Sequence, residues 1–400
     1  MPVQSEVAPA YRWVIVAVAA AVLCIAQGQI VSGFSVYVLP LEAEFGWARG
    51  SVAFVNTAGL LGLGIGGIVM GSLADRVDVR RIALFGAMSL GLGVMAASRA
   101  TELWHLYLAF FCAGMFGSGS LVAPLTSLVG KWFVQGAGLA LGLVAAGQAL
   151  GQGGVPFGAV FLIESFGWRG AMAAQGAITL ALVIPLVLTL RPAPQRPAGS
   201  GALGGDYPLP TNTVILWLSA AVLMCCTTMA VPLMHLVPLI QGRGFAGTEA
   251  GSVLFVMLLV AITGRIAFGK LADVIGAVPA YFTASAWQTA LVFFFTQIET
   301  LGGFYAFAVI YGFGYAGVMT GVLTSVSTLT PPERRGQAMG VILAFAFLGH
   351  GIGGYQGGVF YDLTGAYTVS YANAVLAGVI NLILVGSLFL TLQRRRLAMA

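Results

Sequence analysis

Residues 71–81 read Gly-Ser-Leu-Ala-Asp-Arg-Val-Asp-Val-Arg-Arg, and the first five recur with one change as Gly-Lys-Leu-Ala-Asp at residues 269–273. The two copies lie 198 residues apart. The same offset relates Pro40 to Pro238, Leu125-Thr-Ser127 to Leu323-Thr-Ser325, and Gly167 to Gly365. One offset across half of the chain indicates an internal duplication rather than a coincidence between glycine-rich helices.

The composition assigns the duplicated chain to the membrane. Of its 400 residues, 59% are hydrophobic and 8% are charged, and the mean hydropathy is +0.95. A soluble domain carries about 25% charged residues. This balance excludes a soluble enzyme, a nucleic-acid-binding protein and a disordered scaffold. The net charge of +5 does not indicate nucleic acid as a partner, because the basic residues flank apolar runs.

The apolar runs are long enough for membrane-spanning helices, each of which needs about 20 residues. We expect twelve, at residues 12–39, 51–72, 81–98, 104–129, 136–163, 170–190, 212–240, 250–271, 279–297, 302–328, 337–360 and 368–391. The proline- and glycine-rich segment 191–211 is expected to be a linker. It would join an N-terminal bundle of six helices, residues 1–190, to a second bundle of six, residues 212–400. The predicted fold is therefore an all-α integral membrane protein with two pseudosymmetric halves.

Basic residues predict the orientation. With the N-terminus inside, 13 of the 18 Lys and Arg residues lie on cytoplasmic segments and four on the other side, and Arg265 falls within a span. The positive-inside rule then places both termini in the cytoplasm. We expect a multi-pass protein of the plasma membrane, the inner membrane of a bacterium, whose surroundings are the lipid bilayer.

The motifs support a family resemblance. The stretch 71–81 resembles the loop signature between helices two and three of the major facilitator superfamily, although Asp78 stands where a second glycine is usual. Further motifs resemble the monocarboxylate and oxalate–formate carrier branch: Lys131-Trp-Phe133 before Gly138-Leu-Ala-Leu-Gly142, Phe45-Gly-Trp47-Ala-Arg49, and Asp362-Leu-Thr-Gly365-Ala-Tyr367. The resemblance implies a secondary transporter in which one half rocks against the other around a central site.

Arg265 is the first candidate for that site. A charge within the hydrocarbon region costs about 2.5–3.5 kcal/mol even on the insertion scale, so it marks a functional position by default. Its repeat mate is Gly67, so the charge is an addition to the duplicated scaffold. A guanidinium suits a carboxylate, and the resemblance implies that an arginine in this part of helix eight binds the substrate carboxylate. The alternative is that Arg265 reaches to the cytoplasmic surface.

One departure concerns proton coupling. Animal monocarboxylate carriers have an aspartate one turn before this arginine, whereas this chain has Ala261. The family's usual carboxylate for proton coupling is therefore absent.

Other polar residues could complete the site. His350, which can titrate near neutral pH, is the repeat mate of Gln152, and glycines flank both. Gln29 in helix one and Tyr315 in helix ten are further candidates to line the cavity. For each of these residues, hydrogen bonding between helices is the alternative interpretation.

A second group of candidates concerns gating. Asp75, Arg76 and Asp273 lie at helix ends, where charges can interact with backbone dipoles in one gating state, or can simply be solvated. His235 near the outer end of helix seven is a candidate for an outer gate or an interfacial residue.

The leading hypothesis is transport of a small organic anion by alternating access, with proton symport or anion exchange. The runner-up keeps the fold and changes the cargo to a neutral or aromatic molecule such as a vitamin, or to an amphipathic compound that is exported. A membrane sensor or an anion channel is a third possibility. We find no nucleotide motif, metal cluster or catalytic triad, so neither a cofactor nor enzymatic activity is expected. The bundle could function as a monomer.

Overall fold

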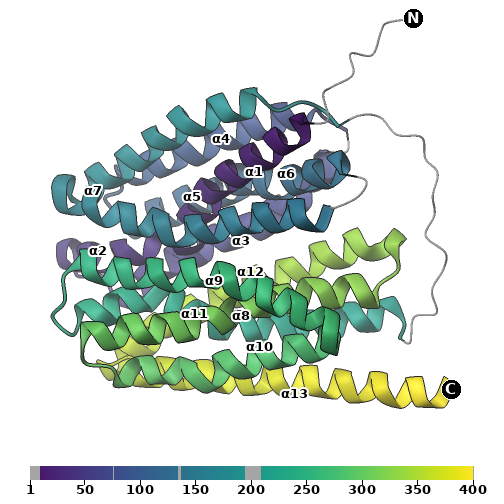
Figure 1. Cartoon of the computed structure of the whole chain (residues 1–400). Coiled ribbons are helices and arrows are strands. Elements are labelled where there is room, and N and C mark those ends of the chain that lie inside the picture. The colour runs from purple at the N-terminus through teal and green to yellow at the C-terminus, as the bar shows by residue number, and fades with distance from the viewer. Residues whose placement is uncertain (1–9, 75, 134–136, 194–208, 400) are drawn as a thin grey trace, which may run out of the picture.

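The computed structural model describes residues 10–74, 76–133, 137–193 and 209–399 (Figure 1). Within these ranges every regular element is a helix. Continuous apolar sequence explains this, because a backbone in lipid must satisfy its hydrogen bonds internally.

The N-terminal half contains ten elements. They are α1 (Tyr11–Gln27), η1 (Gly28–Ser32), η2 (Gly33–Tyr37), α2 (Val38–Phe45), α3 (Arg49–Leu73), α4 (Val79–Ala97), α5 (Leu103–Cys112), η3 (Ala113–Ser118), α6 (Gly119–Trp132) and α7 (Ala137–Leu188). The C-terminal half contains α8 (Thr211–Gln241), α9 (Gly247–Ile275), α10 (Ala277–Leu291), η4 (Val292–Gln297), α11 (Leu301–Leu329), α12 (Pro332–Thr364) and α13 (Thr368–Met399).

These elements accommodate the twelve predicted spans. Ten helices of the described chain are long and apolar enough to cross a membrane. One of them lies within α7, whose backbone leaves the helical region at Gly167 (φ 68°, ψ 172°) and so divides α7 into two successive crossings. The remaining predicted span, residues 279–297, corresponds to α10 followed by the 3₁₀ turn η4.

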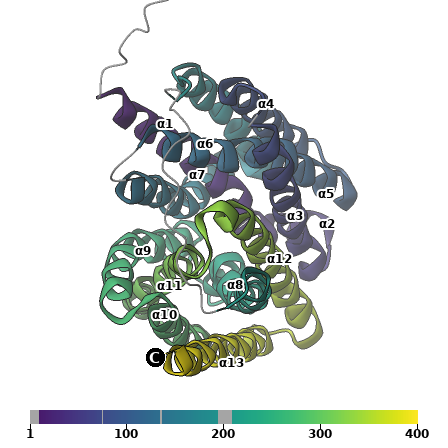
Figure 2. The same ribbon diagram turned by 90° about the vertical axis from the view of Figure 1, so that its right-hand side faces the viewer.

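The helices form two bundles, α1–α7 and α8–α13, as Figure 2 shows from one end. Helix α1 begins and helix α13 ends at the same end of the molecule, which we call the terminal face (right in Figure 1). The opposite end, with the turns at Gly46 and Gly167, is the distal face. Most of the predicted linker lies outside the described residues, so the boundaries at residues 190 and 212 stay a prediction.

Two seams join the bundles, and the first lies between α3 and α12. From the distal face inward, the seam pairs Gly50 with Val359, Thr57 with Gly351, and Gly64 with Phe347. Small residues on this stripe let the two helices approach closely. One heptad nearer the terminal face the contact ends: a Cβ on Gly71 would meet only Ala123 of its own bundle, and a Cβ on Gly340 would meet no atom within 4 Å.

The second seam, between α7 and α9, follows the same course. It pairs Val160 with Gly251, Phe157 with Phe255, Gly153 with Leu258, and Ala145 with Arg265. Beyond Arg265, a Cβ on Gly142 would meet no atom within 4 Å, and one on Gly269 would meet only Thr320 of its own bundle. Both seams are therefore closed at the distal face and separate toward the terminal face.

Candidate functional site

Arg265 lies where the α7–α9 seam begins to open. On α9, positions 251, 255 and 258 contact α7, and positions 257, 264 and 268 contact α11 or its side chains. With about 100° between successive residues of a helix, Arg265 falls between these two packed faces. Its side chain is therefore directed toward the space between the bundles, and it is only partly exposed.

The hydrogen bonds of Arg265 leave one edge of the guanidinium free. Nη1 donates to the backbone carbonyl of Ala145 on α7 at 2.6 Å. Nε is buried without a partner, and Nη2 has no acceptor among the described residues. Buried donors in folded proteins are normally satisfied. The free Nε–Nη2 edge can donate two parallel hydrogen bonds to a carboxylate.

Tyr315 of α11 lies beside this guanidinium, close enough for an electrostatic interaction. The residue is 3% exposed, and its ring packs against Tyr311 with centroids 6.0 Å apart. The Tyr311 hydroxyl is buried without a hydrogen-bond partner. The structure therefore brings the predicted pair of Arg265 and Tyr315 together, with a second orphan polar atom one turn away.

His350 lies on α12, beside the α3–α12 seam. Gly349 and Gly353 pack against α8, whereas Phe347 and Gly351 pack against α3. His350 lies between these two faces on the helix and is half-buried. Its Nδ1 is 3.1 Å from the carbonyl of Ala346, one turn earlier, so Nδ1 carries a proton and donates. Nε2 has no partner within the described chain and is left for another group.

Gln152 is placed on α7 by the same geometry. Gly151 packs against Cys24 of α1, and Gly153 packs against α9, so Gln152 lies between the two faces. Its backbone carbonyl accepts a hydrogen bond from Ser32 Oγ at 2.5 Å. The side-chain amide forms no hydrogen bond to any described residue, which leaves its donor and acceptor available.

Gln29 has a different environment. It is 6% exposed, and its Nε2 donates to Thr179 Oγ1 of α7 at 2.5 Å. This contact lies within the N-terminal bundle, so the structure does not bring Gln29 together with Arg265. The amide connects two helices of one bundle.

His235, the predicted outer gate residue, lies in a cluster at the distal face. It is fully buried on α8, with Nε2 at 2.7 Å from the carbonyl of Gly354 and Nδ1 at 3.3 Å from the Tyr367 hydroxyl. Because Nε2 donates to a carbonyl, Nδ1 accepts from the Tyr367 hydroxyl, and the oxygen of that hydroxyl accepts a hydrogen bond from Arg49 of the other bundle at 3.0 Å. His235 therefore contacts the tyrosine that forms a hydrogen bond between the two bundles.

Arg49 is the centre of this distal cluster. It is 8% exposed and donates through Nε and Nη2 to both carboxylate oxygens of Glu42, at 2.5 and 2.6 Å. Its guanidinium carbon lies 3.7 Å from the centre of the Tyr361 ring. Glu42 belongs to the same bundle as Arg49, whereas Tyr361 and Tyr367 belong to the other. Arg49 is thus held within one bundle and bound by the second.

A carboxylate reinforces the same contact. Asp362, at the end of α12, accepts hydrogen bonds from the backbone N–H groups of Arg49 and Gly50 at 2.8 and 2.7 Å. These groups begin α3, where the helix dipole favours an anion. The repeat mate of Asp362 is Glu164, which lies near the start of α9. Glu164 forms no hydrogen bond to a described residue.

Two of the three gate residues predicted at the terminal face, Arg76 and Asp273, lie within the described residues. Asp75 lies outside the described residues. Arg76 and Asp273 are exposed, and neither has an ion pair within the described part of the chain. Such exposure accompanies the open terminal ends of both seams.

Arg49 and Asp362 were not among the predicted site residues, although both lie in quoted motifs. The sequence places them 313 residues apart in different halves, and no pattern pairs them. The repeat carried a signal, because Asp362 aligns with the acidic Glu164. The binding partner of Asp362 is a pair of backbone N–H groups, and backbone groups have no sequence signature.

Comparisons with known proteins agree with this architecture. Residues 18–277 and 216–398 match the sequence profile of the Major Facilitator Superfamily. Human monocarboxylate transporter 11 is 29% identical over 396 residues, covering 94% of this chain and 82% of that protein. The MFS-type transporter pynF of Aspergillus niger is 26% identical over 312 residues, covering 76% and 70%. A bacterial homologue of the human lysosomal transporter Spinster shares the fold, with a TM-score of 0.69, 15% identity and 99% of both chains covered.

Proposed function

Because the chain belongs to the Major Facilitator Superfamily and is a membrane transporter rather than an enzyme, we propose that it moves a small organic anion by alternating access. Arg265 would bind the carboxylate between the bundles. His350 and Gln152 would complete the site from α12 and α7. The cargo class is consistent with the relatives that are named monocarboxylate transporters.

The free Nε–Nη2 edge of Arg265 is the observation that carries this proposal. A partly buried cation with an unsatisfied donor is costly in an apolar bundle. An anionic cargo would neutralise the charge and satisfy the donor at once. It would also be released as the seam next to Arg265 opens, since Ala145 and Arg265 form the last contact of that seam.

Orientation and coupling complete the proposal. The terminal face would be cytoplasmic, as the distribution of basic residues predicts, so this structure would be open to the cytoplasm. Ala261 offers no carboxylate for proton transfer. Anion exchange needs no such group, whereas proton symport would have to use a different residue, of which His350 is the candidate.

The test is a ligand screen by thermal shift on detergent-purified protein, wild type beside Arg265→Ala. The library contains mono- and dicarboxylates, aromatic acids, vitamins and neutral analogues. A ligand at 100 times its Kd stabilises the folded state by about 2.7 kcal/mol if it binds only that state. We expect a carboxylate to raise the Tm of the wild type and not that of the variant. A neutral compound that stabilises both proteins equally, with no carboxylate effect, would support the runner-up cargo instead.

A further inference from the structure

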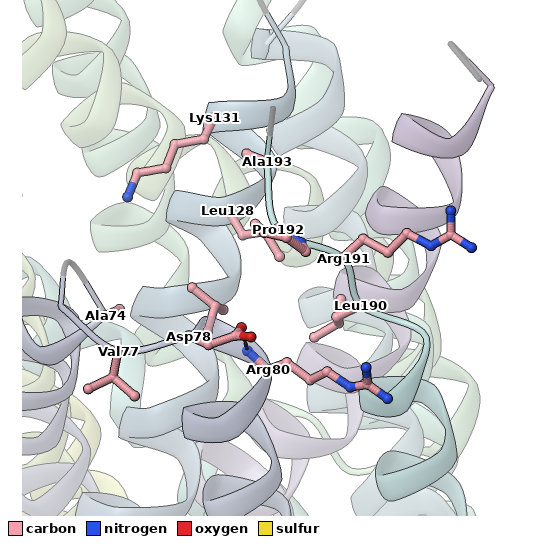
Figure 3. A pocket seen from close by; sticks show the side chains of 11 residues that line it. Ala74, Val77, Asp78, Arg80, Leu128, Lys131, Leu190, Arg191, Pro192 and Ala193 are labelled. Atoms are coloured by element: carbon pink, nitrogen blue, oxygen red, sulfur yellow. Dashed lines mark hydrogen bonds between the residues drawn. The ribbon is translucent and has the colours of Figure 1, made fainter. Parts of the chain in front are cut away.

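A pocket of about 350 Å³ lies at the terminal face of the N-terminal bundle, away from the seams (Figure 3). Its lining comes from residues between α3 and α4, the start of α4, the end of α6 and the segment that follows α7. The lining includes the apolar side chains of Val77, Leu128 and Leu190. A pocket of this volume accommodates a group larger than a single ion.

Three cations line the pocket: Arg80, Lys131 and Arg191. The guanidinium groups of Arg80 and Arg191 extend to the same side in Figure 3, whereas the side chain of Lys131 extends to the opposite side. Among the described lining residues the one acid is Asp78, whose carboxylate caps α4 by accepting a hydrogen bond from the backbone N–H of Arg80 at 2.9 Å. Two guanidinium groups, those of Arg80 and Arg191, therefore give this side of the pocket a positive charge.

Aromatic side chains place the pocket at the depth of lipid headgroups. The Arg191 guanidinium lies over the Tyr11 ring at 4.3 Å, and Tyr11 packs against Trp132 with centroids 6.1 Å apart. Trp13 contacts Phe133 edge-on at 5.1 Å. Tyrosine and tryptophan concentrate at the membrane–water boundary, so this group marks that boundary.

The internal repeat shows that this charge is not part of the scaffold. The mates of Arg80, Lys131 and Arg191 in the second half are Val278, Leu329 and Phe389, and the mate of Asp78 is Gly276. All three cations are therefore specific to the N-terminal half. A role in orienting the chain alone does not require that they share one pocket.

We propose that this pocket binds the phosphate headgroup of an anionic phospholipid from the leaflet at the terminal face. Basic pockets between transmembrane helices bind such headgroups. The apolar side chains Ile178, Leu182 and Leu188 are exposed on the last turns of α7, the helix that ends next to the pocket, and would contact the acyl chains. A free phosphate would use the cations but not this apolar surface, so the structure favours the lipid.

Native mass spectrometry of the detergent-purified full chain tests the proposal, with phosphatidylglycerol, phosphatidylcholine or inorganic phosphate as the probe. The pocket variant is Arg80→Gln with Arg191→Gln. The matched control is Lys270→Gln with Arg394→Gln, which removes two exposed cations from the terminal face of the other bundle. Each membrane-surface cation contributes about fivefold in affinity, so we expect phosphatidylglycerol to bind about 25-fold more weakly to the pocket variant and within twofold of wild type to the control.

Three results would overturn the proposal. Equal loss in both double variants would mean that general surface charge attracts the lipid, and no loss in either would mean that the pocket is not its site. Inorganic phosphate that binds with the same dependence on Arg80 and Arg191, while phosphatidylglycerol binds no better than phosphatidylcholine, would assign the pocket to a soluble anion. All four substituted residues are exposed, so both variants are expected to fold.

Discussion

Arg265→Ala is expected to weaken carboxylate binding about 100-fold, because it removes two proposed charge-assisted hydrogen bonds and the cation that lies where the α7–α9 seam opens. Arg265→Lys is expected to recover only part of this loss, because an ammonium group cannot present two parallel donors. Isothermal titration calorimetry of the purified protein, with the carboxylate identified by the screen, measures the effect.

Lys270→Ala is the matched control for Arg265. Lys270 is an exposed cation on the same helix, just past the end of the seam. Its removal should leave the affinity within about twofold of wild type, since exposed charges contribute little. An equal loss of affinity in both alanine variants would contradict the assignment of the site to Arg265.

Arg49→Gln is expected to shift the equilibrium between the two facing states about 30-fold or more toward opening of the distal face. Its ring contact with Tyr361 and its hydrogen bond to Tyr367 exist only while that face is closed. A desolvated cation–π contact contributes about 2 kcal/mol, and a hydrogen bond to a charged group contributes a similar amount. Loss of such differential contacts moves a two-state equilibrium by the same free energy.

Double electron–electron resonance measures this shift. Spin labels at Ala43 and Gly302 would report the separation of the bundles at the distal face, in a background without the four native cysteines; both positions are exposed. A long-distance population should appear in Arg49→Gln.

Arg169→Gln is the matched control for Arg49→Gln. Arg169 also binds a carboxylate, Glu44, and stacks on an aromatic ring, Trp168, but all of its contacts lie within the N-terminal bundle. Its variant should keep the wild-type distance distribution. A short distance that persists in Arg49→Gln, or a shift in both variants, would contradict the account of the distal gate.

Much of the fold could be predicted because its determinants are local or periodic. A membrane span is recognised by a run of about 20 apolar residues. The 198-residue offset relates the two halves from the sequence alone. The local departures from ideal helix were not predictable. The π turn at Gly28–Ser32 and the break at Gly167 depend on neighbouring helices or on a single positive φ angle, neither of which periodicity reveals.

The candidate site was predictable only in part. Arg265 stands out in the sequence because an isolated charge within an apolar run is costly and marks a functional position by default. Gln29 and Gln152 look alike in sequence, yet only Gln29 is paired with a threonine of its own bundle. That difference is set by which face of each helix meets a neighbour. The distal cluster was missed for a related reason. Asp362 accepts hydrogen bonds from backbone N–H groups, and no residue type in the sequence marks such a partner.

The most direct test of the central claim is solute counterflow in proteoliposomes that contain purified protein and an excess of the unlabelled carboxylate. With the labelled carboxylate outside, the account predicts transient, saturable accumulation in wild type and Lys270→Ala, and none in Arg265→Ala that has been shown to fold. Undiminished accumulation in Arg265→Ala, or counterflow of a neutral compound with none for any carboxylate, would contradict it.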